Sequence, residues 1–408
     1  MDRYSILHMA PRTRRRNNLQ APTPATTTVV TLQTDLLLEI VARSDFSTIV
    51  RCAATCKFLR QDILSRPFIQ RITQQTAACI VVDVCDYGRK PLTLVHPATP
   101  AAATFCQDHL SPFMLRRMAK LLRKYRPEMS RGGLVVLRSI DDLQPKSHTC
   151  VYNPMTGHCT YFSKPPDVKS ISSCFRESVL LTAVDGISCS FMLLFADLYT
   201  GIMKVHTATS LSSTWESVTC SSNTRCGYRS HVVLHGGIIH WLADNNDHIL
   251  TYNVGTRTLE LMELPLTNNH VWSLQLATSR EGNLLKLLAM EGFKIYVWLQ
   301  LPLDPAHGGG GGGGNWSLQN ILDTEEKLRS MCPDMPRNVT VYFEGYENRS
   351  GDVRLLQVQG KDLVQGKDFF YVFVVLDLQT KEVRKHKSSS LWLEIDLPTH
   401  LQTMKVFY

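Results

Sequence analysis

The feature that most constrains the fold is a series of short strand-like runs that fills the chain from Arg131 onward. Runs of four to eight residues, such as GLVVLR, GGIIHWLA and KIYVWLQL, are separated by turns rich in Gly, Asn, Asp and Ser. No comparable helical pattern intervenes, which favours antiparallel sheets over β-α-β units. The sequence therefore predicts a mainly β fold for this part of the chain.

A weak internal repeat indicates how these strands are connected. An Asn or Asp ends an apolar strand and a Thr follows three positions later, at Asn153–Thr156, Asp197–Thr200, Asn253–Thr256 and Asp377–Thr380. The Asx side chain in such a turn bonds the backbone two residues on. The first three copies lie 44 and 56 residues apart, about one propeller blade each, and the gap of 124 before the fourth would hold two more copies. Large aromatic residues suited to packing between blades recur at Trp215, Trp241, Trp272, Trp298 and Trp316. We therefore expect a β-propeller-like domain of about six blades.

The N-terminal stretch Leu32–Arg71 has a helical period instead. Apolar residues such as Leu36 and Ile40 recur at helical spacing, with Thr34 as a candidate N-cap. After an interruption a second helical segment follows, which Pro67 would close. A unit this short cannot easily bury its own apolar face, so it must pack on its neighbour or on another protein.

This stretch resembles the F-box, a small helical motif that docks on the SKP-type adaptor of cullin ubiquitin ligases. The matching positions are Leu32, Asp35, Leu36, Leu37, Glu39, Ile40, Arg43, Val50, Arg51, Cys56, Lys57, Phe58, Ile63, Pro67 and Phe68. The chain departs from the family at Gln33, where Pro is usual, at Ser44-Asp45, where Leu-Pro is usual, and at Phe58-Leu59, where Trp is usual. Most of residues 130–400 is similar to the propeller-like associated region that follows the F-box in many plant proteins, especially those of grasses. SRGGLVVLR, CVYNPMTG and GGIIHWLADNNDHILTYNVGTRTLELMELP carry this second resemblance.

The resemblance implies a substrate-recognition subunit of a Skp–cullin–F-box ubiquitin ligase. Its partners would be the SKP-type adaptor, cullin through that adaptor, and an unknown target protein held by the propeller for ubiquitin-dependent degradation. The implied adaptor-binding residues are Leu32, Asp35, Leu36, Leu37, Ile40, Val50, Cys56, Lys57 and Phe58. The alternatives are a non-degradative interaction scaffold, and a propeller enzyme or sugar-binding module.

Four regions follow from these patterns. We expect a disordered basic tail at 1–30, the F-box helical motif at 31–75, a linker at 76–130 and the β-propeller-like domain at 131–408. The linker holds two strands within 80–97, which could join the propeller, and a basic amphipathic helix over 111–127. That helix would lie on the large domain, on a membrane surface or in a calmodulin-like groove.

The formal charge of +8 is concentrated in two segments. Residues 1–30 carry +4 and residues 111–127 carry +6, so the rest of the chain sums to −2. A large domain without a basic excess argues against nucleic acid as a partner. A basic cluster at Arg12 and Arg14–Arg16 is open to three interpretations: a solvated tail, a weak nuclear-import signal or a transit peptide.

No run is long enough for a membrane helix, and no secretory signal is evident. We therefore expect a cytoplasmic or nuclear protein without a membrane partner. We found no catalytic or cofactor-binding motif, so the sequence predicts neither enzyme activity nor a cofactor. The span that holds Cys220, Cys226, His231 and His235 lacks tight ligand spacing, and we expect no metal there.

Overall fold

The computed structural model describes most of the chain beyond its N-terminal tail. The described residues are 33–44, 46–74, 79–83, 93–96, 99–118, 120–140, 148–154, 156–166, 176–182, 185–197, 202–221, 226–234, 236–243, 248–265, 273–279, 283–301, 315–344, 353–360, 370–386, 392–396 and 401. The predicted tail at 1–30, and with it Leu32, Trp272 and His235, lies outside these ranges.

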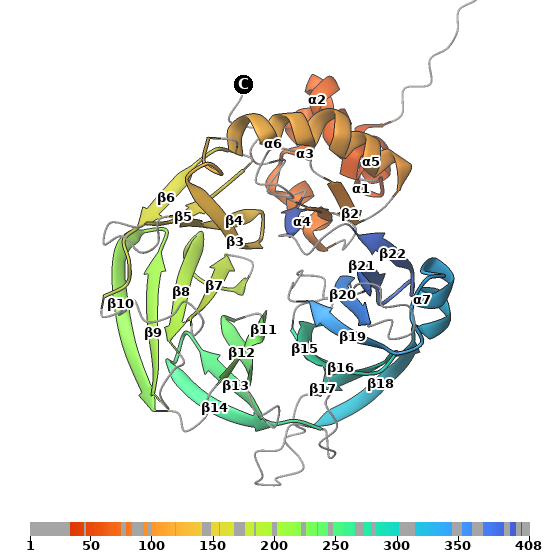
Figure 1. Cartoon of the computed structure of the whole chain (residues 1–408). Coiled ribbons are helices and arrows are strands. Elements are labelled where there is room, and N and C mark those ends of the chain that lie inside the picture. The colour runs from red at the N-terminus through yellow and green to blue at the C-terminus, as the bar shows by residue number, and fades with distance from the viewer. Residues whose placement is uncertain are drawn as a thin grey trace, which may run out of the picture.

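Antiparallel sheets dominate the described residues, and Figure 1 shows them set around a ring. Five sheets have four strands each, taken in chain order. The first two contain β3 (Tyr125–Arg131), β4 (Leu134–Ser139), β5 (Thr149–Tyr152) and β6 (Cys159–Phe162), then β7 (Arg176–Thr182), β8 (Phe191–Asp197), β9 (Ile202–Thr209) and β10 (Ser212–Ser221). The third contains β11 (Cys226–Leu234), β12 (Ile238–Ala243), β13 (His248–Asn253) and β14 (Thr258–Glu263). The last two contain β15 (Ser273–Thr278), β16 (Leu285–Glu291), β17 (Lys294–Gln300) and β18 (Trp316–Asp323), then β19 (Val339–Glu344), β20 (Val353–Gly360), β21 (Phe370–Asp377) and β22 (Val383–His386).

The first strand of each four-stranded sheet faces the inside of the ring. Strand β3 contacts β7, β7 contacts β11, β11 contacts β15, and β15 contacts β19. Each sheet therefore runs outward from its first strand, as in a β-propeller. The mainly β, propeller-like prediction is confirmed at this level.

A sixth, three-stranded sheet joins the two ends of the described chain. It has the order β2-β1-β23, from β1 (Cys79–Asp83), β2 (Thr93–His96) and β23 (Trp392–Asp396). Strand β1 pairs antiparallel with β23, with Val81 opposite Glu394, and β23 also contacts β3. The strands at 80–97 thus belong to the ring, and the last strand closes it.

Among the described residues, four helices precede the ring, where two were expected. They are α1 (Thr34–Ala42), α2 (Phe46–Thr55), α3 (Lys57–Ile63) and α4 (Arg66–Gln74). The predicted second helical segment breaks at Cys56, whose backbone is extended at φ −112° and ψ 107°. Pro67 does not close a helix but lies in the first turn of α4, where its missing N–H costs nothing. Thr34 is the first helical residue, and Gln33 occupies the N-cap position without a side-chain bond.

The predicted basic helix at 111–127 has different bounds. One helical path begins at α5 (Pro100–Phe105), passes through the π-helical turn η2 (Cys106–Leu110) and continues into α6 (Ser111–Met118). Hydrogen-bonded turns then lead from α6 to β3. Thr99 is its N-cap, because the Thr99 hydroxyl accepts from the Ala102 N–H at 3.2 Å. Pro127 does not end a helix but lies in β3, a sheet-edge strand with a register shift beside it, where Pro is tolerated.

One hydrophobic cluster joins the N-terminal helices to the ring. It contains Ala53 of α2, Ile63 of α3 and Met114 of α6, together with Leu137 of β4 and Ile395 of β23. Figure 1 shows helices α1–α6 gathered at one side of the ring. The helical unit thus buries part of its apolar surface against its own chain, as its small size requires.

The predicted Asx turns are confirmed at three of the four copies. Asn153 accepts from the Thr156 N–H at 3.1 Å, Asn253 accepts from the Thr256 N–H at 3.1 Å, and Asp377 accepts from the Thr380 N–H at 3.0 Å. All three connect the third and fourth strands of a sheet. The copy at Asp197 instead follows the second strand of its sheet, and its next four residues lie outside the described ranges. Among the described residues between the copies at Asn253 and Asp377, only one complete sheet, β15–β18, is present, so the expectation of two lost copies there was wrong.

Two of the recurring tryptophans connect neighbouring sheets. The Trp215 indole N–H on β10 donates to the Ser163 carbonyl, just beyond β6, at 2.9 Å. The Trp316 N–H on β18 donates in the same way to the Glu263 carbonyl at the end of β14, at 3.1 Å. In both cases the outermost strand of one sheet is tied to the outermost strand of the preceding sheet.

Candidate docking surface on the N-terminal helices

Large apolar side chains remain exposed on the N-terminal helices. Leu36 and Ile40, one turn apart on α1, are 52% and 55% exposed, and Phe58 in the first turn of α3 is 64% exposed. On the other side of α1, Val41 and Ala42 are buried in the shared cluster. Helix α1 therefore has two apolar sides, one used by the fold and one directed to solvent. We call Leu36, Ile40 and Phe58 the apolar face.

The junction between α2 and α3 sets the position of Phe58. The Arg60 guanidinium reaches back to the end of α2, where its Nε donates to the Ala53 carbonyl at 2.7 Å and its Nη2 to the Ala54 carbonyl at 2.8 Å. These carbonyls belong to the last turn of α2, where a cation also complements the helix dipole. The Cys56 sulfur accepts from the Leu59 N–H at 3.5 Å and caps α3. Both contacts hold the first turn of α3, and with it Phe58, in a fixed orientation.

A carboxylate on α1 connects this helix to α4. Glu39 forms ion pairs with Arg43, one turn further along α1, and with Arg71 on α4. Hydrogen bonding from Arg71, opposed by desolvation and aided by both positive charges, lowers the pKa of Glu39 below its ordinary value. The pair with Arg71 links α4 to α1 at the surface.

The structure separates the predicted adaptor-binding residues into three groups. Asp35 and Lys57 are exposed together with the apolar face, while Leu37 and Cys56 are half-buried. Val50 is buried in the shared cluster, where its side chain supports α2 from inside. Leu32 lies outside the described residues.

Sequence reasoning did not identify Arg60 as a residue that positions the site. A signal was available in the sequence, because Arg60 follows Ala53 by seven residues and Ala54 by six. A basic side chain near a helix C-terminus can bond the last carbonyls of that helix. Seeing this signal required knowledge of the break at Cys56, which periodicity alone did not give.

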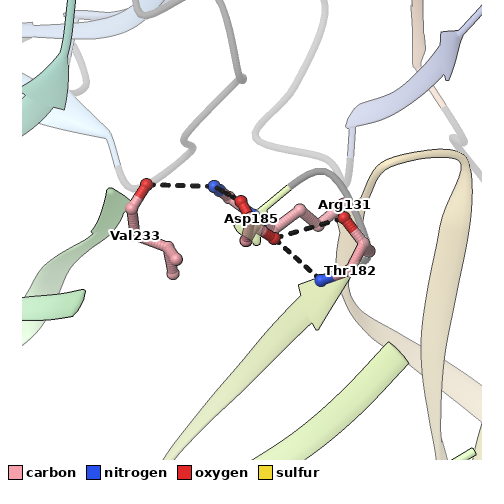
Figure 2. Close-up of polar contacts among 4 residues, drawn as sticks. All are labelled: Arg131, Thr182, Asp185 and Val233. Atoms are coloured by element: carbon pink, nitrogen blue, oxygen red, sulfur yellow. Dashed lines mark hydrogen bonds and ion pairs between the residues drawn. The ribbon is translucent and has the colours of Figure 1, made fainter. Parts of the chain in front are cut away.

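A second polar cluster lies buried on the inner side of the ring (Figure 2). The Arg131 guanidinium at the end of β3 binds both carboxylate oxygens of Asp185, at 2.8 and 3.1 Å, and donates to the Val233 carbonyl of β11 at 3.1 Å. Asp185 also accepts from the Thr182 N–H at the end of β7, at 2.7 Å. The turn residue Gly132 allows this close approach, because a Cβ there would lie 3.0 Å from the Thr182 side chain. The four residues connect three consecutive sheets.

The described residues contain neither a membrane-spanning helix nor a metal-binding group. None of the helices in these ranges is long and apolar enough to cross a bilayer. Within the same ranges, no three His, Cys, Asp or Glu side chains are grouped as a metal ion would require. In the span that holds Cys220, Cys226, His231 and His235, the side chains of Cys226 and His231 and the whole of His235 lie outside the described part of the structure.

Comparison with known proteins assigns most of the chain to a family. Residues 95–407 match the family described as "Domain of unknown function (DUF7595)". The chain belongs to the DUF7595 family. The DUF7595 match begins within β2 and includes every later strand, whereas helices α1–α4 and strand β1 precede it. No curated protein matches the chain.

Solved structures show distant similarity to this DUF7595 protein. Virginiamycin B lyase from Staphylococcus aureus is 12% identical, with a TM-score of 0.32 over 65% of this chain and 70% of that chain. A member of the DUF4221 family from Bacteroides vulgatus is 8% identical, with a TM-score of 0.34 over 67% of this chain and 83% of that chain. At these scores neither structure informs the function of the DUF7595 chain.

Proposed function

We propose that this DUF7595 protein is the substrate-recognition subunit of a Skp–cullin–F-box ubiquitin ligase. Helices α1–α4 bind the SKP-type adaptor, and the six described sheets are the blades of a six-bladed propeller that captures a target protein. The proposal combines the F-box resemblance of residues 32–68 with the way these helices are presented.

The observation that carries the proposal is the exposed apolar face. Leu36, Ile40 and Phe58 are each more than half exposed. The other side of α1, in contrast, is buried in the shared cluster. Complete burial of such a side chain stabilises a complex by roughly 1.5–3 kcal/mol relative to full exposure. Because these three side chains are about half exposed, burial by a partner would contribute about half of that free energy for each. Exposed apolar groups on adjacent packed helices fit the mode in which helices dock in a partner's groove.

The attachment of the helices to the ring suits such a receptor. Because α2, α3, β4 and β23 share one core, a target on the propeller is held at a fixed place relative to the adaptor. A bound target's lysines then meet the ubiquitin donor at a raised effective concentration. In this role no residue of the chain needs to touch the reacting bond.

A pull-down with the SKP-type adaptor tests the docking surface. The variant Leu36→Asp/Ile40→Asp should lose adaptor binding, because both charges enter the apolar contact. Its melting temperature should stay close to that of the unmodified chain, since both side chains point to solvent. The matched control is Leu211→Asp/Ile321→Asp, which alters two exposed apolar residues of the ring and should bind normally.

Unchanged adaptor binding by Leu36→Asp/Ile40→Asp would refute this docking surface. A second assay separates a ligase receptor from a scaffold. A protein captured by the ring should acquire ubiquitin chains in the reconstituted complex, and the docking variant should abolish them. Adaptor binding without any chain formation would favour the non-degradative scaffold instead.

A further inference from the structure

The helical path through α6 continues beyond Met118 as hydrogen-bonded turns. The Leu122 N–H donates to the Met118 carbonyl at 3.0 Å, and the Tyr125 N–H donates to the Leu121 carbonyl at 2.9 Å. Both bonds have the i to i−4 spacing of an α-helix. Side chains from position 114 to position 125 can therefore be assigned to helical faces.

Two opposite faces result. Met114, Met118 and Leu122, spaced four residues apart, are buried in the cluster that joins the helices to the ring. On the other side Arg116, Lys120 and Lys124, at the same spacing, are exposed to solvent. Arg123 and Arg126 are also exposed and extend the positive surface to the start of β3. We call Arg116, Lys120, Arg123, Lys124 and Arg126 the basic strip.

The positive charges of the strip are not paired with carboxylates among the described residues. None of the five side chains forms an ion pair with a carboxylate within the described residues. Other arginines of the chain differ, because Arg138 pairs with Glu128 and Arg329 pairs with Glu325. Residues 109–127 contain no acidic residue at all. Like charges this close repel one another, so an anionic partner would be bound favourably.

We propose that the basic strip binds an acidic segment of a second protein. From Arg116 to Arg126 the strip extends roughly 15 Å, at about 1.5 Å per residue. An extended segment covers that length with about five residues, at about 3.3 Å each. The occupant is therefore a short run of Asp and Glu residues.

The same geometry disfavours two other anionic partners. A membrane-bound amphipathic helix inserts its apolar side, but here Met114, Met118 and Leu122 are already packed inside the protein. Nucleic acid binding relies on many phosphate contacts over an extended basic surface, whereas the chain outside residues 1–30 and 111–127 sums to −2. The exposed Tyr161 ring lies beside Tyr125, with 6.4 Å between the two ring centroids. Tyr and Arg are both enriched at protein–protein interfaces, which favours a protein as the partner. This proposal does not depend on adaptor docking.

Fluorescence anisotropy with a labelled peptide of about five consecutive Glu residues tests the proposal. The full chain should bind the peptide, with an affinity that weakens about tenfold between about 50 and 200 mM salt, as expected for exposed charges. Arg116→Glu/Lys120→Glu/Arg123→Glu/Lys124→Glu should abolish binding. The control is Lys204→Glu/Lys294→Glu/Arg337→Glu/Lys385→Glu, which makes the same charge change at exposed positions outside the strip and should bind within about twofold of the unmodified chain.

Three results would overturn the proposal. The first is an equal loss of binding in the control variant, because overall charge would then explain the effect. The second is tighter binding to vesicles of phosphatidylserine and phosphatidylcholine, or to poly-uridine RNA, than to the peptide at the same salt. The third is peptide binding that survives the strip variant while its melting temperature matches that of the unmodified chain.

Discussion

At the scale of single residues, His240 on β12 is a titratable side chain whose pKa is changed by burial. Its Nδ1 lies 2.9 Å from the Thr251 hydroxyl on β13, and the ring is almost completely buried. Burial lowers the pKa of His240 from its ordinary value of 6.5 to about 4, because a charged imidazolium would lose its hydration. His240 is therefore neutral in the folded protein over the physiological range.

This shift predicts a pH-dependent stability. Between about pH 6.5 and about pH 4 the unfolded chain binds a proton at His240 that the folded protein does not bind. The free energy of unfolding should therefore fall as the pH falls through this window, by about 2 kcal/mol between about pH 7 and pH 5. Urea unfolding of the unmodified chain and of His240→Gln at both pH values measures this contribution. Equal pH dependence in the two proteins would contradict it.

Local turn chemistry was the part of the structure that single residues predicted best. The Asx turns at Asn153, Asn253 and Asp377 form because the carboxamide or carboxylate bonds a backbone N–H two or three residues away, which the sequence shows directly. Which exposed residues form the apolar face could be predicted only in part. Val50 has the same chemistry as Ile40, and only the packing of α2 against the ring places Val50 inside.

At the scale of elements, the Arg131–Asp185 pair connects strands that are far apart in sequence. Its side chains are 10% and 6% exposed, so removal of the carboxylate charge leaves a buried guanidinium without its counter-charge. We expect Asp185→Asn to lower the free energy of unfolding by about 3–5 kcal/mol, measured by urea unfolding.

A matched exposed pair provides the control for that prediction. Arg257 and Glu216 also connect two sheets at 2.9 Å, but their side chains are 58% and 68% exposed. Glu216→Gln should cost less than about 1 kcal/mol. Similar costs for the two variants would show that the buried pair does not hold the inner strands together.

The number and bounds of the helices were harder to predict than their presence. Apolar periodicity located the helical region, but it continues smoothly across Cys56, where the chain turns so that α3 can pack against α1 and α2. The helix predicted at 111–127 failed at both ends for a related reason. Arg126 and Pro127 carry no strand signal of their own, and pairing with β4 draws them into a sheet.

At the scale of the whole molecule, the ring depends on a pairing between its two ends. Strand β23 pairs with β1 along its entire length, and its Trp392 and Leu393 are completely buried. Deletion of residues 392–408 should therefore abolish the cooperative thermal transition and make the protein sensitive to protease. Deletion of residues 1–30, the predicted tail, should leave the melting temperature unchanged. A synthetic peptide of residues 391–401 should restore protease resistance to the shortened ring.

A shortened ring with an unchanged melting temperature would contradict this account. Periodicity predicted some of the strands, such as β4, β12 and β17, and the spacing of the repeats predicted several similar sheets. The partner of β1 could not be predicted, because β23 lies some 300 residues away and neither strand has a sequence pattern that specifies its neighbour in the sheet.

The shared sheet also sets an order of events during synthesis. Strand β1 is made early, yet its partner leaves the ribosome only after the whole ring has been translated. The same late segment supplies Ile395 and Leu401 to the core beneath α2 and α3. An unfinished polypeptide thus has helices α1–α4 without their full support. Under the proposed function, adaptor binding by these helices would have to wait until the last strand is in place.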